Sequence, residues 1–400
     1  MTKKVLNIIL LGVLLLLLSF SCSPFNGVRD ANSKYTPSIL VDNYINLHPD
    51  TVAYKNEAKS YKWNYEQGLM LEAIYRTWQE TDNEKYYDYI KKNIDYYVGD
   101  DGSIKTYAFD SFNLDNVVSG RVLLHLYEIT KERKYKLAAD HLIGQLKEQP
   151  QTSEGGFWHK KIYPYQMWLD GLYMAEPFYS EYSKMFGAVS NFDDIANQFI
   201  LVKKHLYDPR TGLYYHGWDE SKEQKWSDSK NGTSTNFWGR SIGWFSMAMV
   251  DVLDSFPKDR EDRAELLMMF QNLCTVLVKY RDGDSKLWYQ VLDKKDSTGN
   301  YIETSCSSMF IYSFAKGYNK GYLTENYLDM AKESFNSLSN NFIKADDKGN
   351  FYLTNVCSVG GLGGNPYRDG SFNYYISEPK RDNDFKGYGP LIFASVELNK

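Results

Sequence analysis

The chain of 400 residues carries 46 Lys and Arg against 51 Asp and Glu, which gives a formal net charge of −5. This balance provides no general attraction for nucleic acid or an acidic polymer, so a few local cations must hold any anionic substrate. Aromatic residues make up 16% of the chain, with 34 Tyr and 9 Trp, a composition that suits sugar stacking and helix packing equally well.

The first predicted element is a secretion signal. Two lysines precede an apolar run of 14 residues at Val5–Leu18, and small residues then lead to Cys22. A membrane-spanning helix needs roughly 20 apolar residues, so the run is too short to be one. We therefore expect residues 1–21 to be a lipoprotein signal peptide, with a lipid on Cys22 and a tether over 22–35. Loss of the two lysines leaves 44 basic and 51 acidic residues, a net charge of −7.

After residue 40 the chain is predicted to form helices separated by Gly and Asp turns, without long strands. A polar turn followed by a Tyr that opens a helix recurs at Tyr86, Tyr135 and Tyr327. Further helices are predicted at Asn191–Leu206 and Glu261–Tyr280. Six helical hairpins of roughly 60 residues each would fit a closed ring, although a helical solenoid would satisfy the same arithmetic.

No Pro/Ser-rich linker or charge block divides the mature chain. We therefore predict one domain over residues 36–400. The polar and Gly-rich stretches at 218–235 and 358–381 are predicted to be loops, and loops of this length are often functional.

Two carboxylates are candidates for acid–base chemistry. Asp115 precedes a predicted helix at about 117–129, so it is either an N-cap or a second carboxylate that tunes a catalytic acid. Asp170 is followed by Tyr173 and Met174, which would share its helix face, exclude water, raise its pKa and keep it protonated as a general acid. Alternatively, Asp170 stabilises a first helical turn, whose dipole would lower its pKa.

Several other side chains suit ligand binding. His159 and Lys160 follow a Gly-Gly turn and are either an exposed loop pair or donors to a sugar. His216 is a ligand-facing or a structural histidine. Arg240 and Trp244 are four residues apart and can share a helix face, which suits either a uronate or an internal cation–π contact.

Other patterns argue against common cofactors. The six histidines show no metal-binding spacing, and Cys274, Cys306 and Cys357 form no disulfide framework, so we predict no metal and no cofactor. At least one of these cysteines is predicted to be a buried small apolar residue. The run Gly360–Gly364 matches no phosphate-binding pattern and is interpreted as a tight loop near the ligand.

Taken in order, these clusters resemble the unsaturated rhamnogalacturonyl hydrolases of glycoside hydrolase family 105. The resemblance covers nearly all of the mature chain and rests on WNYEQGLMLEAIY, FNLDNVVSGRVLLHLY, GGFWHKKIYPYQMWLDGLYMAEPF, GLYYHGWDE, FWGRSIGWFSMAMVDVLD, YIETSCSSMFIYSFAKG, RDGSFNYYISEP and DNDFKGYGP. It implies an all-α fold, an (α/α)6 barrel with its site at the open end. Gln151 stands where many relatives are expected to have Arg, which weakens any claim about recognition through that loop.

The resemblance also implies a reaction and roles. Such enzymes hydrate the C4=C5 bond of an unsaturated uronate, with Asp170 in the WLD motif as the acid/base and Asp115 in the NLD motif as the second carboxylate. The side chains implied to line the substrate are His159, Lys160, His216 and Arg240, with Trp63, Trp238 and Trp244 as stacking walls.

Other functions stay open at this point. The first-choice substrate is an unsaturated galacturonyl-rhamnose oligosaccharide from pectin, and an unsaturated glucuronyl product comes next. A sugar epimerase or lyase on the same barrel, or a non-catalytic glycan-binding lipoprotein, would satisfy fewer motifs. No nucleic-acid partner is expected, and the membrane is met only through the lipid on Cys22. We expect the protein in the bacterial cell envelope, on the periplasmic side of the outer membrane.

Overall fold

The computed structural model describes residues 34–55 and 57–400. The predicted signal peptide at 1–21, the lipidated Cys22 and nearly all of the predicted tether lie outside the described residues. Residues 35–400 form one compact unit. Within the described part of the chain, no helix is long and apolar enough to cross a membrane.

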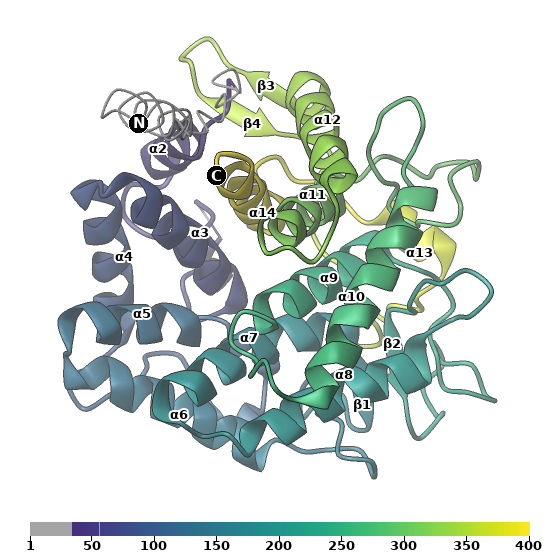
Figure 1. The fold of residues 1–400 in the computed structure, drawn as a ribbon, viewed down its shortest axis with the longest axis horizontal. Helices are drawn as coiled ribbons and strands as arrows, with labels where there is room; N and C mark the ends of the chain where they lie inside the picture. The colour runs from purple at the N-terminus through teal and green to yellow at the C-terminus, as the bar shows by residue number, and fades with distance from the viewer. Residues whose placement is uncertain (1–33, 56) are drawn as a thin grey trace, which may run out of the picture. The chain divides into compact units, whose positions relative to one another are not determined.

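Six helices of this unit form a closed inner ring (Figure 1). Each packs on the next, and the last packs on the first. Every residue of the fourth helix in the ring is buried, as expected for a helix that is surrounded by other helices. The ring consists of α3 (Tyr65–Thr81), α5 (Gly120–Thr130), α7 (Leu169–Phe186), α9 (Gly239–Val252), α11 (Thr304–Asn319) and α14 (Phe385–Leu398).

Six outer helices pack on the outside of the inner ring. They bury only one stripe of side chains; the last of them, for example, has five buried residues, all between Ala331 and Ser339. The outer helices are α2 (Pro37–Leu47), α4 (Glu84–Tyr97), α6 (Arg133–Glu148), α8 (Asn191–Leu206), α10 (Glu261–Lys279) and α12 (Glu325–Phe342). Because α2 packs on α14, and α14 on α3, the ends of the unit meet and close the ring. The predicted (α/α)6 barrel is confirmed, and the open solenoid is excluded.

The remaining elements are short and belong to the connections. Two antiparallel pairs join β1 (Gln166–Trp168) to β2 (Gly217–Asp219) and β3 (Ile343–Ala345) to β4 (Phe351–Leu353). The other short elements are the 3-10 turns η1 (Ala58–Ser60), η2 (Phe109–Ser111) and η3 (Leu114–Asn116), and helix α13 (Phe372–Ser377). The two predicted loops at 218–235 and 358–381 therefore contain the end of β2 and the whole of α13.

The predicted helix boundaries are mostly close to the observed ones. Helix α8 has the predicted bounds and α10 ends one residue early. The helix predicted at about 117–129 begins only at Gly120. Asp115 lies in η3, where the side chain of Asn113 accepts a hydrogen bond from the Asp115 backbone N–H at 3.1 Å. The N-cap interpretation of Asp115 is therefore wrong, and its carboxylate is free for other contacts.

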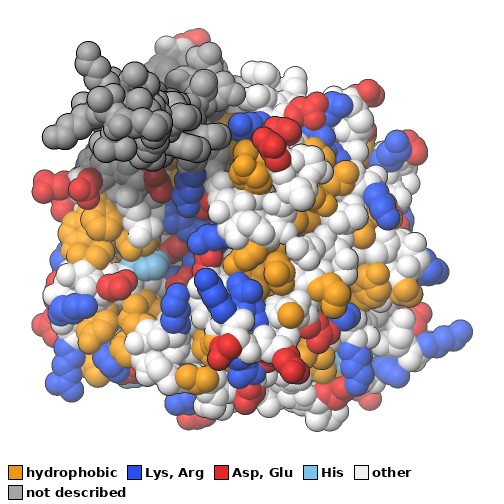
Figure 2. Space-filling view, viewed as in Figure 1, with side chains coloured by type: hydrophobic (Ala, Val, Ile, Leu, Met, Phe, Trp, Pro, Cys, Tyr) orange, Lys and Arg blue, Asp and Glu red, His pale blue; other side chains and the backbone are white. Residues whose placement is uncertain are grey.

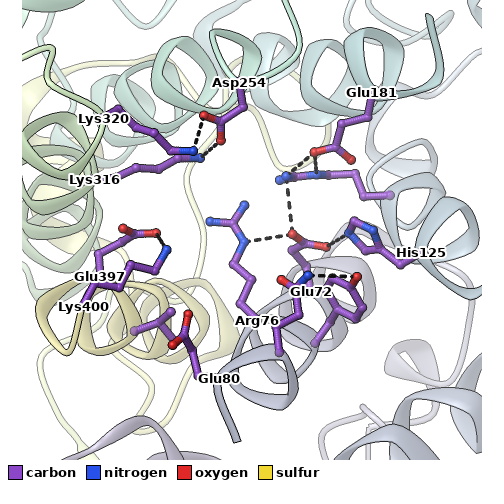
Figure 3. Close-up of a pocket in the computed structure, with 14 residues that line it drawn as sticks. Glu72, Arg76, Glu80, His125, Glu181, Asp254, Lys316, Lys320, Glu397 and Lys400 are labelled. Carbon is purple, nitrogen blue, oxygen red and sulfur yellow. Dashed lines mark hydrogen bonds and ion pairs between the residues drawn. The ribbon is translucent and has the colours of Figure 1, made fainter. Parts of the chain in front are cut away.

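The inner helices run in one direction, so the ring has two different ends. At one end, side chains of these helices surround a cavity of about 220 Å³ that is lined mostly by charged groups (Figure 3). Three cations that line this cavity also pair with the fully buried Asp251: Arg76 at 3.0 Å, Arg121 at 2.8 Å and Lys316 at 2.6 Å. Although burial opposes ionisation, these three cations hold the pKa of Asp251 well below its usual value. Ion pairs therefore surround the cavity at this end of the ring.

Candidate active site

A second cavity, of about 200 Å³, lies where the inner helices begin. Residues at or next to the first position of four of these helices line it: Tyr65 of α3, Asp170 of α7, Arg240 of α9 and Lys386 of α14. Backbone N–H groups at helix starts carry partial positive charge, which favours a bound anion. Figure 2 shows charges of both signs mixed over one face of the molecule, so a positive site depends on local geometry and not on a general field.

Asp170 is the second residue of α7, and its side chain is 13% exposed. Its Oδ2 lies 3.2 Å from Nε2 of His216. Met174, one turn later, lines the same cavity, as the spacing predicted. Tyr173 is buried and its ring packs on Trp244 at 4.8 Å. Asp170 is thus a carboxyl group in largely apolar surroundings with one side open to the cavity.

Asp115 faces the same cavity from η3. Its Oδ2 lies 2.5 Å from Nζ of Lys160, and its Oδ1 lies 3.4 Å from Nε2 of His159. Burial opposes ionisation of Asp115, but nearby basic groups, chiefly Lys160, together outweigh burial and keep the pKa of this carboxyl below its usual value. Burial lowers the pKa of His159 to about 4. At neutral pH Asp115 is therefore ionised and His159 is neutral.

His216 is fully buried. Backbone pairing brings it to Asp170, because β2 pairs with β1 and the N–H of Leu169 donates to the carbonyl of His216 at 3.0 Å. The centroid of its imidazole lies 5.5 Å from that of the Trp168 ring and 4.8 Å from that of the Trp238 ring. Because these neighbours are aromatic rings, the polar contacts of His216 are made by its two ring nitrogens.

Aromatic rings form one wall of the cavity. Trp168 lies between the ring of His159, at 4.6 Å, and the ring of Tyr163, at 4.8 Å, and all three are stacked. Trp238 and Trp244, which were predicted as walls, also line the cavity. Neither Trp168 nor Tyr163 was predicted, although Trp168 opens the WLD motif, and its position two residues before Asp170 was the available signal.

The two arginines that line the cavity differ in their burial and in their hydrogen-bond partners. Arg240 is 1% exposed; its Nε donates to Ser305 at 2.7 Å, and its Nη2 contacts the Cys357 carbonyl and Glu303. Its Nη1 is buried and makes no hydrogen bond to any residue that the structure describes. The unpredicted Arg368 donates from Nε to the Gly363 carbonyl at 2.8 Å and from Nη2 to the Tyr163 hydroxyl at 2.9 Å, and its guanidinium lies over Trp168.

Trp63 occupies a different place from the predicted stacking wall. It is 1% exposed, its indole N–H donates to the Asn116 carbonyl at 2.8 Å, and its ring meets Tyr97 edge-on. It does not line the cavity, whereas Tyr65, two residues later, does. The chain enters α3 through the cap residue Asn64, which separates the two rings, so Trp63 anchors the helix start and Tyr65 faces the site.

A third cavity, of about 280 Å³, adjoins this one and shares Tyr65, Asp115 and Lys160 with it. Its other lining groups are polar or aromatic and include Tyr54, Lys62 and Arg381. The two cavities together give a site longer than one sugar ring, with Asp115 and Lys160 at the junction.

Cysteines and metal-binding side chains add little to the site. Cys274, Cys306 and Cys357 are free and buried, as predicted for at least one of them. Among the residues that the structure describes, no group of three or more His, Cys, Asp or Glu side chains is placed to hold a metal ion.

The Gly360–Gly364 run is a loop, and Gly360 lines the cavity, which agrees with its predicted place near the site.

Comparison with known proteins agrees with this fold. The sequence profile of Glycosyl Hydrolase Family 88 matches residues 40–400. The solved structure of a glycoside hydrolase from family 105 of C. acetobutylicum ATCC 824 is 43% identical, covers 92% of this chain and 99% of its own, and superposes with a TM-score of 0.87.

Two similar sequences differ in how much of the chain they match. Protein Atu3128 of Agrobacterium fabrum is 36% identical over 230 residues, 56% of this chain and 97% of its own length. The unsaturated rhamnogalacturonyl hydrolase YesR of Bacillus subtilis is 26% identical over 265 residues, 65% of this chain and 72% of its own length.

Proposed function

The chain belongs to glycosyl hydrolase family 88, and we propose that it removes a 4,5-unsaturated uronic acid from the non-reducing end of an oligosaccharide left by a polysaccharide lyase. The observation that carries this proposal is the position of Asp170: a carboxyl group at a helix start, beside His216, opening into a cavity lined by arginine, lysine and tryptophan. Such a cavity suits an anionic sugar ring, and the carboxyl suits proton transfer to it.

The proposed reaction is a hydration. Protonated Asp170 gives its proton to C4 of the enol ether, and the positive charge that develops at C5 is shared with the ring oxygen. A water molecule adds to C5 while the Asp170 carboxylate takes its proton, which restores the acid. The product carries hydrogen on C4 and hydroxyl on C5; this hemiketal opens and releases the neighbouring sugar. The carboxylate spacing that distinguishes retaining from inverting glycosidases does not apply to this route.

Other side chains hold the substrate in this proposal. Four cations line the cavity, Lys160, Arg240, Arg368 and Lys386, against the two carboxylates Asp115 and Asp170. Arg240 and Lys386 are paired with Glu303 and Asp384, so Arg368, which has no ion pair among the described residues, is the cation best placed to bind the uronate carboxylate. Asp115 stays ionised beside Lys160 and accepts hydrogen bonds from sugar hydroxyls, while Trp168, Trp238 and Trp244 stack on the ring.

For the substrate we propose unsaturated galacturonyl-rhamnose from rhamnogalacturonan. The motif resemblance and the name of the YesR relative support this choice. The third cavity supports a leaving sugar that is uncharged, because its lining holds three cations, Lys62, Lys160 and Arg381, and three carboxylates, Glu57, Glu66 and Asp115.

One assay tests the function. Protein that starts after residue 22 is mixed with unsaturated galacturonyl-rhamnose, and the ultraviolet band of the conjugated double bond is followed together with free rhamnose. Loss of the band with equimolar release of rhamnose supports the proposal. Loss of the band only with a glucuronyl substrate would show that the enzyme removes unsaturated glucuronate instead of unsaturated galacturonate. An unchanged band with both substrates refutes uronyl hydrolysis and leaves an epimerase or a glycan-binding protein.

We also propose that the protein is anchored to the periplasmic side of the outer membrane through a lipid on Cys22. The lysine pair, the short apolar run and the small residues before Cys22 support this proposal. Cys22→Ala should leave the protein uncleaved and without incorporated radiolabelled palmitate, whereas the wild type should incorporate the label. Equal labelling of both proteins would contradict the anchor.

A further inference from the structure

Two buried side chains and the partly exposed Asp170, from distant parts of the chain, form a polar row that ends at the cavity. The hydroxyl of Tyr375 lies 2.7 Å from Nδ1 of His216, and Nε2 of His216 lies 3.2 Å from Oδ2 of Asp170. Tyr375 and His216 are both fully buried. Tyr375 comes from α13, so the C-terminal loop reaches the predicted acid/base through a single histidine.

Tyr375 is held in place from two sides. Its ring stacks on Trp238 with an interplanar angle of 19°. The amide of Gln290 donates to the Tyr375 carbonyl at 2.9 Å, and the same amide accepts from the Trp238 indole N–H at 3.1 Å. One side chain thus fixes both rings, and the Tyr375 hydroxyl has little freedom to leave His216.

The position of the protons follows from the partners. Burial raises the pKa of Tyr375 well above its usual value, so the group stays a hydroxyl. A neutral imidazole has one N–H and one acceptor nitrogen. The Oδ2 of Asp170 that faces Nε2 is an acceptor, so the hydrogen between the two atoms belongs on Nε2. Nδ1 is then the acceptor, and the Tyr375 O–H donates to it.

We propose that Tyr375 is a positioning residue that acts through His216 on Asp170; this inference rests on the proposed function. By donating to Nδ1, Tyr375 keeps the hydrogen of His216 on Nε2, where it faces the buried Oδ2 of Asp170. With Oδ2 occupied as an acceptor, the acid form of Asp170 carries its proton on Oδ1, the oxygen left for the cavity and for C4 of the substrate.

His216 and Asp170 lie close together, but the N–H bond of His216 does not point at the carboxylate oxygen. Nε2 and Oδ2 are at hydrogen-bonding distance, and neither makes another hydrogen bond among the described residues, yet the N–H direction misses the oxygen. Catalytic hydrogen bonds often tighten only when substrate binds. A small rotation of the imidazole about its Tyr375 contact completes the row.

The first test reads the tautomer directly and does not need activity. ¹⁵N spectra of the histidine-labelled protein contain six imidazoles, and His216→Gln identifies the signal of interest. We expect the pure Nε2–H form in the wild type and a mixture of tautomers in Tyr375→Phe. An Nδ1–H form in the wild type, or the same spectrum in both proteins, would overturn the proposal.

The second test is kinetic. Losing an outer hydrogen-bond partner of a functional group typically costs about 10- to 100-fold, so Tyr375→Phe should lower kcat by that factor with KM within about threefold. The control Tyr96→Phe removes a hydroxyl from a 62% exposed side chain of α4, outside the cavity, and should keep kcat. In a His216→Ala background Tyr375→Phe should have no further effect on kcat, because its route to Asp170 is gone.

The outcomes separate the two proposals. Normal kcat in folded Tyr375→Phe, or an undiminished loss in the His216→Ala background, refutes the positioning role. A wild type that is inactive on every unsaturated uronide refutes the proposed function, and the tautomer spectra still decide what Tyr375 does to His216.

Discussion

Replacing Arg368 with Gln should weaken recognition of the uronate carboxylate. Of the cavity's two arginines, Arg240 is buried and held by Ser305 and the Cys357 carbonyl, whereas Arg368 is only partly buried. No described residue hydrogen-bonds the Nη1 atom of Arg368, since its Nε and Nη2 make the contacts to the loop and to Tyr163. That nitrogen can donate to a substrate carboxylate.

The size of the effect follows from one charge-assisted hydrogen bond. Such bonds contribute about 1.5–3 kcal/mol, which corresponds to a fall in kcat/KM of about 10- to 150-fold at 1.4 kcal/mol per factor of ten. The methyl ester of the same unsaturated disaccharide offers a neutral acceptor, worth about 0.5–1.5 kcal/mol. The ester should therefore lose only about 2- to 12-fold on the same scale.

The assay compares kcat/KM for acid and ester in the wild type, in Arg368→Gln and in the control Arg210→Gln. The control removes the same charge at an 80% exposed side chain outside the cavity and should leave both values unchanged. A misplaced loop would lower activity on acid and ester alike, because Arg368 also holds the Gly363 carbonyl. Equal losses on both substrates would refute the carboxylate contact.

Three further predictions concern the acid/base, the Asp115 pair and the buried arginine. Asp170→Asn should lower kcat at least about 100-fold without changing the melting temperature; near-normal turnover of folded protein would rule out its role. Lys160→Met removes the charge that offsets burial, so the pKa of Asp115 should rise and the acidic limb of the kcat/KM profile should move to higher pH; an unmoved limb would contradict the pairing. Arg240→Met leaves the fully buried Glu303 without its cation, which should cost about 3–5 kcal/mol in urea unfolding; a loss under 1 kcal/mol would show that the pair does not stabilise the fold.

Local sequence pattern predicted individual helices, whereas the closed barrel, as opposed to an open solenoid, was predicted only from the family resemblance. The bounds of α8 follow from an amphipathic run between turns. Asp170 and Met174, and likewise Arg240 and Trp244, face one cavity because helix periodicity fixes residues four apart on one side. This part of the site was predictable from spacing.

The rest of the site depends on contacts that spacing does not encode. Trp63 and Tyr65 are two residues apart beside one helix start, and only the backbone path through Asn64 decides which ring faces the cavity. Arg368 meets Tyr163 across 205 residues, and Tyr375 meets His216 across 159. Both come from a Gly-rich segment without periodicity, so nothing local distinguishes them from solvent-facing loop residues.

The parallel course of the inner helices explains how a chain of net negative charge can offer a site for an anion. Partial positive charge gathers where the helices begin, around Asp170 and Arg240, and partial negative charge gathers where they end. The ending side places cations such as Lys316 and Lys320 beside the last turns, and pairs them with Asp254 (Figure 3). At the other end, Lys160, Arg240 and Lys386 are also ion-paired, with Asp115, Glu303 and Asp384, and Arg368 has no ion pair among the described residues. The direction of the helices therefore places partial positive charge, and an arginine without an ion pair, at the end where the candidate site lies.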